Sequence, residues 1–233
     1  MLVSILVPCY NEKKTIEQRI NKIVNLKIQK EIIIIDDGSN DGTTDILKKN
    51  LKKKKIKFLK KKKKKGKGSA IILGLKKCKG ELIAIQDADL EYNPKDLIKI
   101  FKKFENKKIK VVYGSRVLGK KRFSLKKKLI TNFRVFANLI LTLISNIINF
   151  QKLTDAHTCY KIFRSNLLKK IKLREKGFAF CPELTTKFSN NNIEIIEVPI
   201  SYKGREIKDG KKIRFTDALE AIFVIIKYKF TLR

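Results

Sequence analysis

Short apolar runs alternate with helical patterns along the first half of the chain. The runs are rich in Ile and Val, are bounded by turn residues and lie at residues 2–7, 32–35, 82–85 and 111–113. They predict buried β-strands. Between them, apolar residues recur at helical spacing over residues 16–24 and 97–104. This alternation predicts an α/β fold, with a mostly parallel sheet flanked by helices.

The pattern changes after residue 115. A basic segment at 120–128 precedes a long amphipathic stretch at 129–150, a strand-like run at 193–199 and an apolar helical pattern at 218–230. Neither an internal repeat nor a Gly/Ser linker divides the chain, so we expect a single domain over 1–233. In it, residues 116–233 close over the sheet formed by 1–115. The helix at 129–150 either packs on the sheet or turns its apolar face to an interface, and the pattern fits both.

The charge balance is strongly basic. The 233 residues include 56 Lys and Arg against 22 Asp and Glu, a formal net charge of +34. Lys occupies polar positions throughout, which indicates either a compositional bias at solvent-facing sites or a field that attracts polyanions. The unbroken lysine block at 60–65 is typical of a solvated loop. With 43% hydrophobic residues, the chain has enough apolar side chains for a core, which excludes disorder.

A nucleic-acid-binding module is the main rival from another class. Such a module gathers basic residues on one face and interleaves aromatic residues for stacking. Here Lys is spread everywhere, Trp is absent and the aromatic residues fall mostly in apolar patterns. The rival also leaves the acidic residues after the strands unexplained. We therefore expect no nucleic-acid partner.

Neither a secretory signal nor a membrane span is predicted. The apolar start at 1–7 is too short for a signal peptide and lacks a basic beginning. The stretch at 129–150 is interrupted by Asn132, Arg134, Asn138, Asn146 and Asn149. The four cysteines are far apart, with no Cys-x-x-Cys pair, which favours a reduced cytoplasmic chain with ordinary buried thiols.

Polar clusters follow four of the predicted strands, at residues 8–12, 36–43, 86–91 and 114–116. Open α/β sheets bind ligands at the carboxyl ends of their strands. Each cluster alone fits a capped turn, but four at four strand ends favour a binding site. Asp87 and Asp89 can converge on a hard divalent cation that bridges to substrate phosphates. Asp-x-Asp by itself is a weak signal.

As an ordered set, these motifs resemble a known family. The set comprises Val7-Pro8-x-Tyr10-Asn11-Glu12, Asp36-Asp37-Gly38-Ser39-x-Asp41-Gly42-Thr43, Gly66-Lys67-Gly68, Asp87-Ala88-Asp89, Gly114-Ser115-Arg116, Thr154-Asp155-x-x-Thr158-Cys159-Tyr160-Lys161, Phe178-x-Phe180-x-Pro182-Glu183, Glu197-Val198-Pro199-Ile200-x-Tyr202-x-x-Arg205 and Gly210-Lys211-Lys212-Ile213. It covers nearly the whole chain and resembles the family 2 inverting glycosyltransferases, most closely the polyprenyl-phosphate (dolichol-phosphate mannose type) synthases. The resemblance implies a GT-A fold, with the nucleotide-sugar half at 1–115 and the acceptor-side half at 116–233.

The resemblance also implies roles for single residues. Those implied to bind the nucleotide-sugar are Pro8, Tyr10, Glu12, Ile35, Asp37, Lys67, Asp87, Ala88, Lys211 and Lys212. A divalent metal, Mg²⁺ or Mn²⁺, would be held by Asp87, Asp89 and Glu91. Glu91 stands where many of these synthases have Gln, so the metal preference is open. Asp89, Arg116 and Arg205 are the implied catalytic residues, whereas the single histidine, His157, is expected to have a structural or substrate-orienting role.

The implied activity is transfer of a sugar, with inversion, from a nucleotide-sugar to a polyprenyl phosphate. A lipid phosphate is already an anion, so it needs positioning and charge stabilisation rather than a general base. The alternative is an alcohol acceptor in surface polysaccharide or glycan synthesis. A lipid acceptor implies peripheral association with an anionic membrane surface, on the cytoplasmic face, through residues 120–128 and 129–150. A membrane-embedded partner subunit, the sugar and the base (GDP or UDP) stay open.

Overall fold

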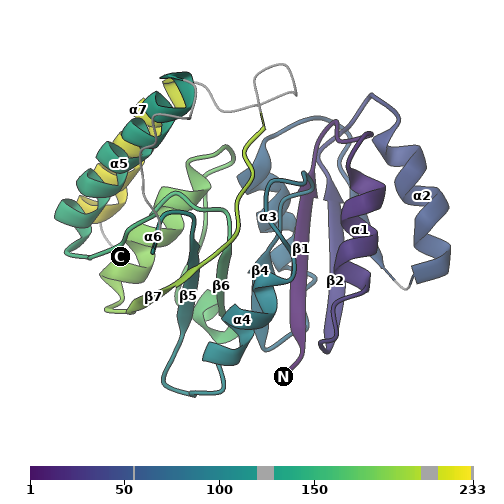
Figure 1. The fold of residues 1–233 in the computed structure, drawn as a ribbon, viewed down its shortest axis with the longest axis horizontal. Coiled ribbons are helices and arrows are strands. Elements are labelled where there is room, and N and C mark those ends of the chain that lie inside the picture. Colours follow the sequence, from purple (N-terminus) through teal and green to yellow (C-terminus); the bar gives the residue numbers. More distant parts are fainter. Residues whose placement is uncertain (55, 120–128, 206–214, 232–233) are drawn as a thin grey trace.

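The computed structural model describes residues 1–54, 56–119, 129–205 and 215–231. Its strands form one seven-stranded sheet in the order β3-β2-β1-β4-β6-β5-β7 (Figure 1). The strands are β1 (Val3–Cys9), β2 (Lys30–Asp36), β3 (Lys57–Lys60), β4 (Leu82–Ile85), β5 (Val111–Ser115), β6 (Lys161–Arg164) and β7 (Ile195–Pro199).

Six of these described strands run in one direction, and β6 runs in the other. β1 pairs in parallel with β2 and β4, β2 with β3, and β5 with β7. β6 is antiparallel to both of its neighbours, β4 and β5, so β4 and β5 point the same way. The carboxyl ends of β1, β2, β4 and β5 therefore meet at one edge, together with the residues that lead into β6.

Helices cover both faces of the sheet. They are α1 (Ile16–Val24), α2 (Thr43–Lys54), α3 (Lys67–Leu75), α4 (Asp96–Lys103), α5 (Leu129–Asn149), α6 (Phe180–Asn190) and α7 (Phe215–Phe230), with a short 3₁₀ helix, η1 (Ser165–Lys169), after β6. Ile20 of α1 and Ile100 of α4 share one core with Ile5 of β1. Ile71 of α3 and Leu184 of α6 share a second core with residues of the opposite sheet face. Alternate strand residues thus serve two cores, which makes a three-layer arrangement.

The structure confirms the α/β prediction and adds a strand that ends where the lysine block begins. The predicted strands and the two helices of the first half are present. The added strand is β3, which pairs with β2 through Ile33↔Lys57 to Asp36↔Lys60, and residues 61–66 after it form a loop, as predicted for the block at 60–65. Edge strands commonly carry lysine, and β3 has Lys at both ends. Its only apolar residues are Phe58 and Leu59, which are too few to show a strand pattern in the sequence. The predicted basic loop at 120–128 lies outside the described residues.

The helix at 129–150 packs on other helices, and several of its polar side chains are buried while several apolar ones are exposed. α5 lies alongside α7 and also contacts α6 (Figure 1). The polar side chains of Thr142, Ser145 and Asn149 are buried, with Asn149 Nδ2 donating to Thr186 Oγ1 of α6 at 3.2 Å. Four of the described apolar side chains of α5 are exposed instead, those of Phe136, Ile140, Leu143 and Ile147. Among the described residues, no helix is long and apolar enough to cross a membrane.

Candidate active site

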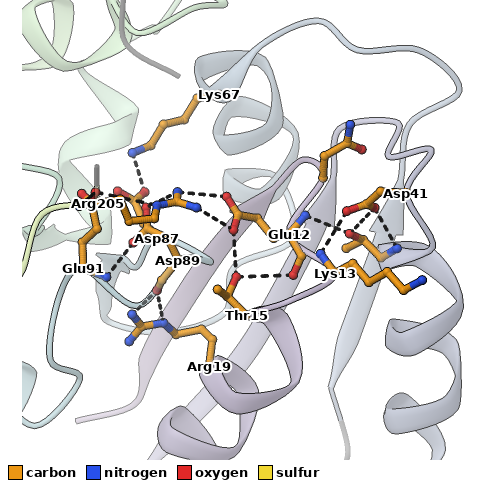
Figure 2. A network of polar contacts seen from close by, with 12 residues as sticks. Glu12, Lys13, Thr15, Arg19, Asp41, Lys67, Asp87, Asp89, Glu91 and Arg205 are labelled. Carbon is orange, nitrogen blue, oxygen red and sulfur yellow. Dashed lines mark hydrogen bonds and ion pairs between the residues drawn. The ribbon is translucent and has the colours of Figure 1, made fainter. Parts of the chain in front are cut away.

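Acidic and basic side chains from distant parts of the sequence meet at the carboxyl edge of β1 and β4. Glu12 comes from the segment after β1, and Asp87, Asp89 and Glu91 come from the segment after β4 (Figure 2). Arg205, which follows β7 in the sequence, lies among them. This is the edge at which the sequence predicts a binding site.

Arg205 is the centre of this cluster. Its Nη1 and Nη2 atoms donate to the two carboxylate oxygens of Glu12 at 3.2 and 3.1 Å, and Nη2 also donates to Asp89 Oδ2 at 2.9 Å. The backbone N–H of Arg205 donates to Glu91 Oε1 at 2.7 Å. Burial opposes the guanidinium charge, but Glu12, Asp89 and Glu91 outweigh it and raise the pKa of Arg205 above its usual value. The guanidinium is therefore a fixed positive charge between acids.

Lys67 holds the other carboxylate of the Asp-x-Asp motif. Its Nζ contacts Asp87 Oδ1 in an ion pair and lies 3.0 Å from Cys159 Sγ. Burial disfavours both charges, but the attraction between the partners is stronger. It lowers the pKa of Asp87 and raises the pKa of Lys67 well above its usual value. Both groups are therefore ionised at neutral pH.

Asp89 lies in a more negative environment than Asp87. Burial, followed by the charges of Asp87 and Glu91, raises the pKa of Asp89 to about 6, although Arg205 counteracts the shift. Its Oδ1 accepts from the backbone N–H of Glu91 at 3.1 Å, and its backbone carbonyl accepts from Arg19 Nε at 2.6 Å. The backbone at Asp89 is thus fixed by α1, while its side chain faces an excess of negative charge.

Arg116 is tied to Asp155 rather than to the carboxylate cluster. Its Nε and Nη2 atoms donate to the two oxygens of Asp155 at 2.7 and 2.8 Å. The guanidinium carbon lies 5.1 Å from the centre of the Tyr202 ring, and the hydroxyl of Tyr202 donates to Glu91 Oε2 at 2.8 Å. The expected catalytic residue Arg116 is therefore linked to the cluster through one aromatic ring.

The residues expected to contact the nucleotide fall into different environments. Pro8 pairs with Ile35 across β1 and β2, and the Ile35 side chain has no exposed surface, so the structure does not bring it to the site. Asp37 accepts from Lys61 Nζ and from the backbone N–H groups of Lys65 and Gly66. Its carboxylate therefore holds the chain between β3 and α3.

The other residues expected to bind the nucleotide differ in how far they are exposed. The Tyr10 ring is partly exposed, and Lys64 Nζ lies 4.6 Å from its centre. Ala88 is buried between the two acids of its motif. Lys211 and Lys212 lie outside the described residues. The structure thus brings Glu12, Lys67 and the Asp-x-Asp segment together and leaves the base-binding end of the site as a prediction.

The donor chemistry of Asp87 and Asp89 fits a divalent cation. Among the described residues, no group of three or more His, Cys, Asp and Glu side chains is placed to hold a metal ion. The expected set of Asp87, Asp89 and Glu91 therefore stays a prediction. Mg²⁺ in particular commonly binds through one or two carboxylates and completes its shell with water and substrate phosphates. Burial and the charges of Asp87 and Glu91 raise the pKa of Asp89, and a bound dication would offset both, in agreement with such a pair.

Sequence reasoning missed Arg19. Its side chain is fully buried in α1, where burial lowers the pKa, and it reaches the Asp89 carbonyl. The signal was present, because Arg19 interrupts the apolar face that Ile16, Ile20 and Ile23 define. A charged residue on a buried face nearly always has a specific polar partner. The partnership of Arg116 with Asp155 was also missed, although both residues lie within quoted motifs.

Comparisons with known proteins identify the class of this fold. The crystal structure of glucosyl-3-phosphoglycerate synthase from Mycobacterium tuberculosis, with Mn²⁺, UDP and phosphoglyceric acid, superposes with a TM-score of 0.70 at 15% identity, covering 99% of this chain and 79% of that one. The fold is therefore that of the GT-A glycosyltransferases, as the resemblance implied.

Two curated relatives and a family model narrow the class. UDP-N-acetylglucosamine--dolichyl-phosphate N-acetylglucosaminyltransferase of Methanococcus voltae is 32% identical, covering 85% of this chain and 84% of the relative. Dolichol-phosphate mannosyltransferase of Pyrococcus furiosus is 26% identical, covering 98% of this chain and 65% of the relative. The family model "Glycosyl transferase family 2" matches residues 4–172. The chain belongs to glycosyl transferase family 2 and is a glycosyltransferase.

Proposed function

We propose that the protein transfers a sugar from a nucleotide-sugar to a polyprenyl phosphate, with inversion and with the help of a divalent metal. The observation that carries the proposal is the alternation of acids and cations at one edge, where Asp87 faces Lys67 and Asp89 faces Arg205. Acids suit a metal bound to the donor diphosphate, and cations suit the phosphate groups themselves. The two dolichyl-phosphate relatives support the acceptor class.

The chain's own residues would act through position and charge. A phosphate acceptor attacks as an anion, so no side chain has to remove a proton. Lys67 and Arg205 are fixed beside the motif that follows β4, where they can stabilise the negative charge that develops on the leaving diphosphate. A metal held by Asp87 and Asp89 would neutralise part of the same charge. Arg116, fixed by Asp155, supplies a further positive charge next to Tyr202.

The outer face of α5 and α7 supports attachment to a membrane surface. Among the side chains that the structure describes, nine large apolar ones are exposed there, and we call them the α5–α7 ridge: Phe136, Ile140, Leu143, Ile147, Phe150, Leu219, Phe223, Ile226 and Phe230. Lys229 Nζ lies 5.2 Å from the centre of the Phe150 ring, so a basic group accompanies the apolar ones. Apolar side chains flanked by Lys, on a chain of net charge +34, suit the interface of an anionic bilayer.

The test is a transfer assay on the purified protein with a panel of UDP- and GDP-sugars. Each donor is offered with Mn²⁺ or Mg²⁺ and with a polyprenyl phosphate, and the lipid product is detected by mass spectrometry. The matched acceptor control is the polyprenol of the same length, which lacks only the phosphate. We expect one or a few donors to give a polyprenyl-phosphate sugar, with the anomeric configuration opposite to that of the donor.

Two outcomes would contradict the proposal. Equal transfer to polyprenol and polyprenyl phosphate would mean that the phosphate is not the nucleophile. Transfer to soluble sugar alcohols, with no lipid product, would favour the alcohol-acceptor alternative.

A further inference from the structure

Arg205 occupies one of the carboxylate oxygens that the proposed metal needs. Asp89 offers two carboxylate oxygens, of which Oδ2 accepts from Arg205 Nη2 at 2.9 Å and Oδ1 accepts from the Glu91 backbone at 3.1 Å. Figure 2 shows the guanidinium between Glu12 and the Asp-x-Asp segment. An oxygen that already contacts a guanidinium cannot be approached by a dication without strong repulsion between the two positive charges.

One N–H donor of the Arg205 guanidinium, Nε, makes no hydrogen bond to the described residues. Arg205 Nε is buried and has no hydrogen-bond partner among the described residues, and its nearest carboxylate oxygen, Glu91 Oε1, is 3.7 Å away. A buried N–H without a partner lowers the stability of this arrangement. Within the described part of the chain, the side chain of Arg205 is therefore held by three hydrogen bonds to Glu12 and Asp89, with no hydrogen bond from Nε, and this incomplete set favours its displacement by another cation.

The backbone of the same segment is held independently of the guanidinium. Tyr202 donates its hydroxyl to Glu91 Oε2 at 2.8 Å, and the Lys203 N–H donates to the Glu91 carbonyl at 2.8 Å. The Arg205 N–H adds a third bond to Glu91, at 2.7 Å. The guanidinium can consequently leave Asp89 while residues 202–205 remain anchored on Glu91.

From these contacts we propose that Arg205 is an internal counter-cation that excludes a divalent metal from Asp89 until the donor arrives. The guanidinium and the metal bind Asp89 in alternation, so metal entry releases Arg205, whose positive charge is then free for the phosphates of the substrates. The inference rests on the proposed function, since it takes Asp87 and Asp89 as the metal ligands. It adds a coupling between metal binding and the segment after β7.

The experiment measures Mn²⁺ binding to the purified protein without donor, by the EPR signal of free Mn²⁺. Arg205→Gln removes the charge and keeps a long polar side chain, whereas Arg205→Lys keeps the charge. Lys203→Gln is the matched control, because it removes one exposed positive charge two residues away. We expect Arg205→Gln to bind Mn²⁺ about tenfold more tightly than the wild type. The Mn²⁺ affinity of Lys203→Gln should stay within about twofold of the wild-type affinity. The affinity of Arg205→Lys should lie between those of Lys203→Gln and Arg205→Gln.

A second arm adds the nucleoside diphosphate, UDP or GDP. Its phosphates give the released guanidinium a new partner, so the difference between wild type and Arg205→Gln should shrink. Melting curves check that each variant is folded. If Arg205→Gln does not fold, Arg205→Lys serves as the test variant. Equal Mn²⁺ affinity of wild type and Arg205→Gln would overturn the inference. The absence of Mn²⁺ binding in every variant would overturn it as well. The transfer assay tests the proposed function independently of either result.

Discussion

The environment of Asp89 opposes its negative charge. Its pKa of about 6 results from burial and from the neighbouring acids, and a bound dication would relieve that opposition. We expect Asp89→Asn to lower the transfer rate by about 100-fold or more, because the leaving diphosphate loses stabilisation. Initial rates at saturating Mn²⁺ measure this, and far-UV circular dichroism checks the fold. Asp45→Asn, on the exposed side of α2, is the matched control. A rate near that of wild type would remove Asp89 from the site.

Arg205 should affect the chemical step more than donor binding. Its guanidinium already has partners before substrate binds, and its charge is most useful as negative charge moves onto the leaving group. For Arg205→Ala we expect kcat to fall by about tenfold or more, with a smaller change in the donor KM. Steady-state kinetics at fixed metal separate the two effects, with Lys203→Ala as the control. A raised KM with unchanged kcat would show uniform binding instead.

His157 should report on the pH dependence of folding. It is the single histidine of the chain, and burial, followed by the nearby charge of Lys161, lowers its pKa to about 4. The unfolded chain takes up this proton near pH 6.5 and the folded protein only near 4, so this contribution to stability is complete above pH 6.5. It is lost as pH falls between these values, by at most about 1.4 kcal/mol per pH unit.

Two measurements check the histidine prediction. NMR of the imidazole should show titration near pH 4, and urea unfolding should show a steeper loss of stability between pH 6.5 and 4.5 in wild type than in His157→Gln. An imidazole that titrates near 6.5 in the folded protein would show that the ring is solvated.

At the scale of elements, periodicity predicted several of the helices and strands with buried apolar faces, but it missed α3 and α6. α1 and α4 turn Ile20 and Ile100 into the core, as the helical spacing requires. β3 was missed because its edge position allows Lys at both ends. β6 was missed because Lys161 and Arg164 at its ends leave only two apolar residues between them, unlike the four of β4. The location of the acids at one edge of the sheet could be predicted from the parallel strands. The ion pair between Arg205 and Glu12 could not. No local pattern connects residues so far apart.

The α5–α7 ridge predicts a two-part response of membrane binding to salt. Attraction of Lys to anionic lipid weakens as the Debye length falls to about 3 Å near 1 M salt, whereas apolar insertion does not. We expect co-sedimentation with anionic liposomes that falls sharply but not completely in high salt, and only slight binding to neutral liposomes. Phe223, 65% exposed on α7, is the place to separate the two parts.

The matched pair of variants is Phe223→Glu and Gln18→Glu. Each adds one negative charge at an exposed helical position, but Gln18 lies on α1, outside the ridge. Phe223→Glu should abolish most of the salt-resistant binding, and Gln18→Glu should leave it intact. Equal loss in the two variants would mean that charge alone attaches the protein.

At the scale of the whole molecule, a net charge of +34 should make stability depend on ionic strength. Like charges repel one another more in the compact state than in the unfolded chain, and salt screens this repulsion. We expect the melting temperature to rise by several degrees between about 10 and 300 mM NaCl, as measured by calorimetry. Sucrose at equal osmolality is the control without charge. A melting temperature that falls with salt would mean that attractive ion pairs outweigh the repulsion.

The position of Arg205 in the sequence has a consequence for synthesis on the ribosome. Arg205 is separated from Glu12 by 193 residues and from Asp89 by 116. The strands that carry the acids emerge early, and an N-terminal part can fold before the rest is made. Until residue 205 leaves the exit tunnel, Glu12, Asp89 and Glu91 face one another without the guanidinium that joins them in the finished protein. This edge is thus completed only after the strands that carry its acids have been made.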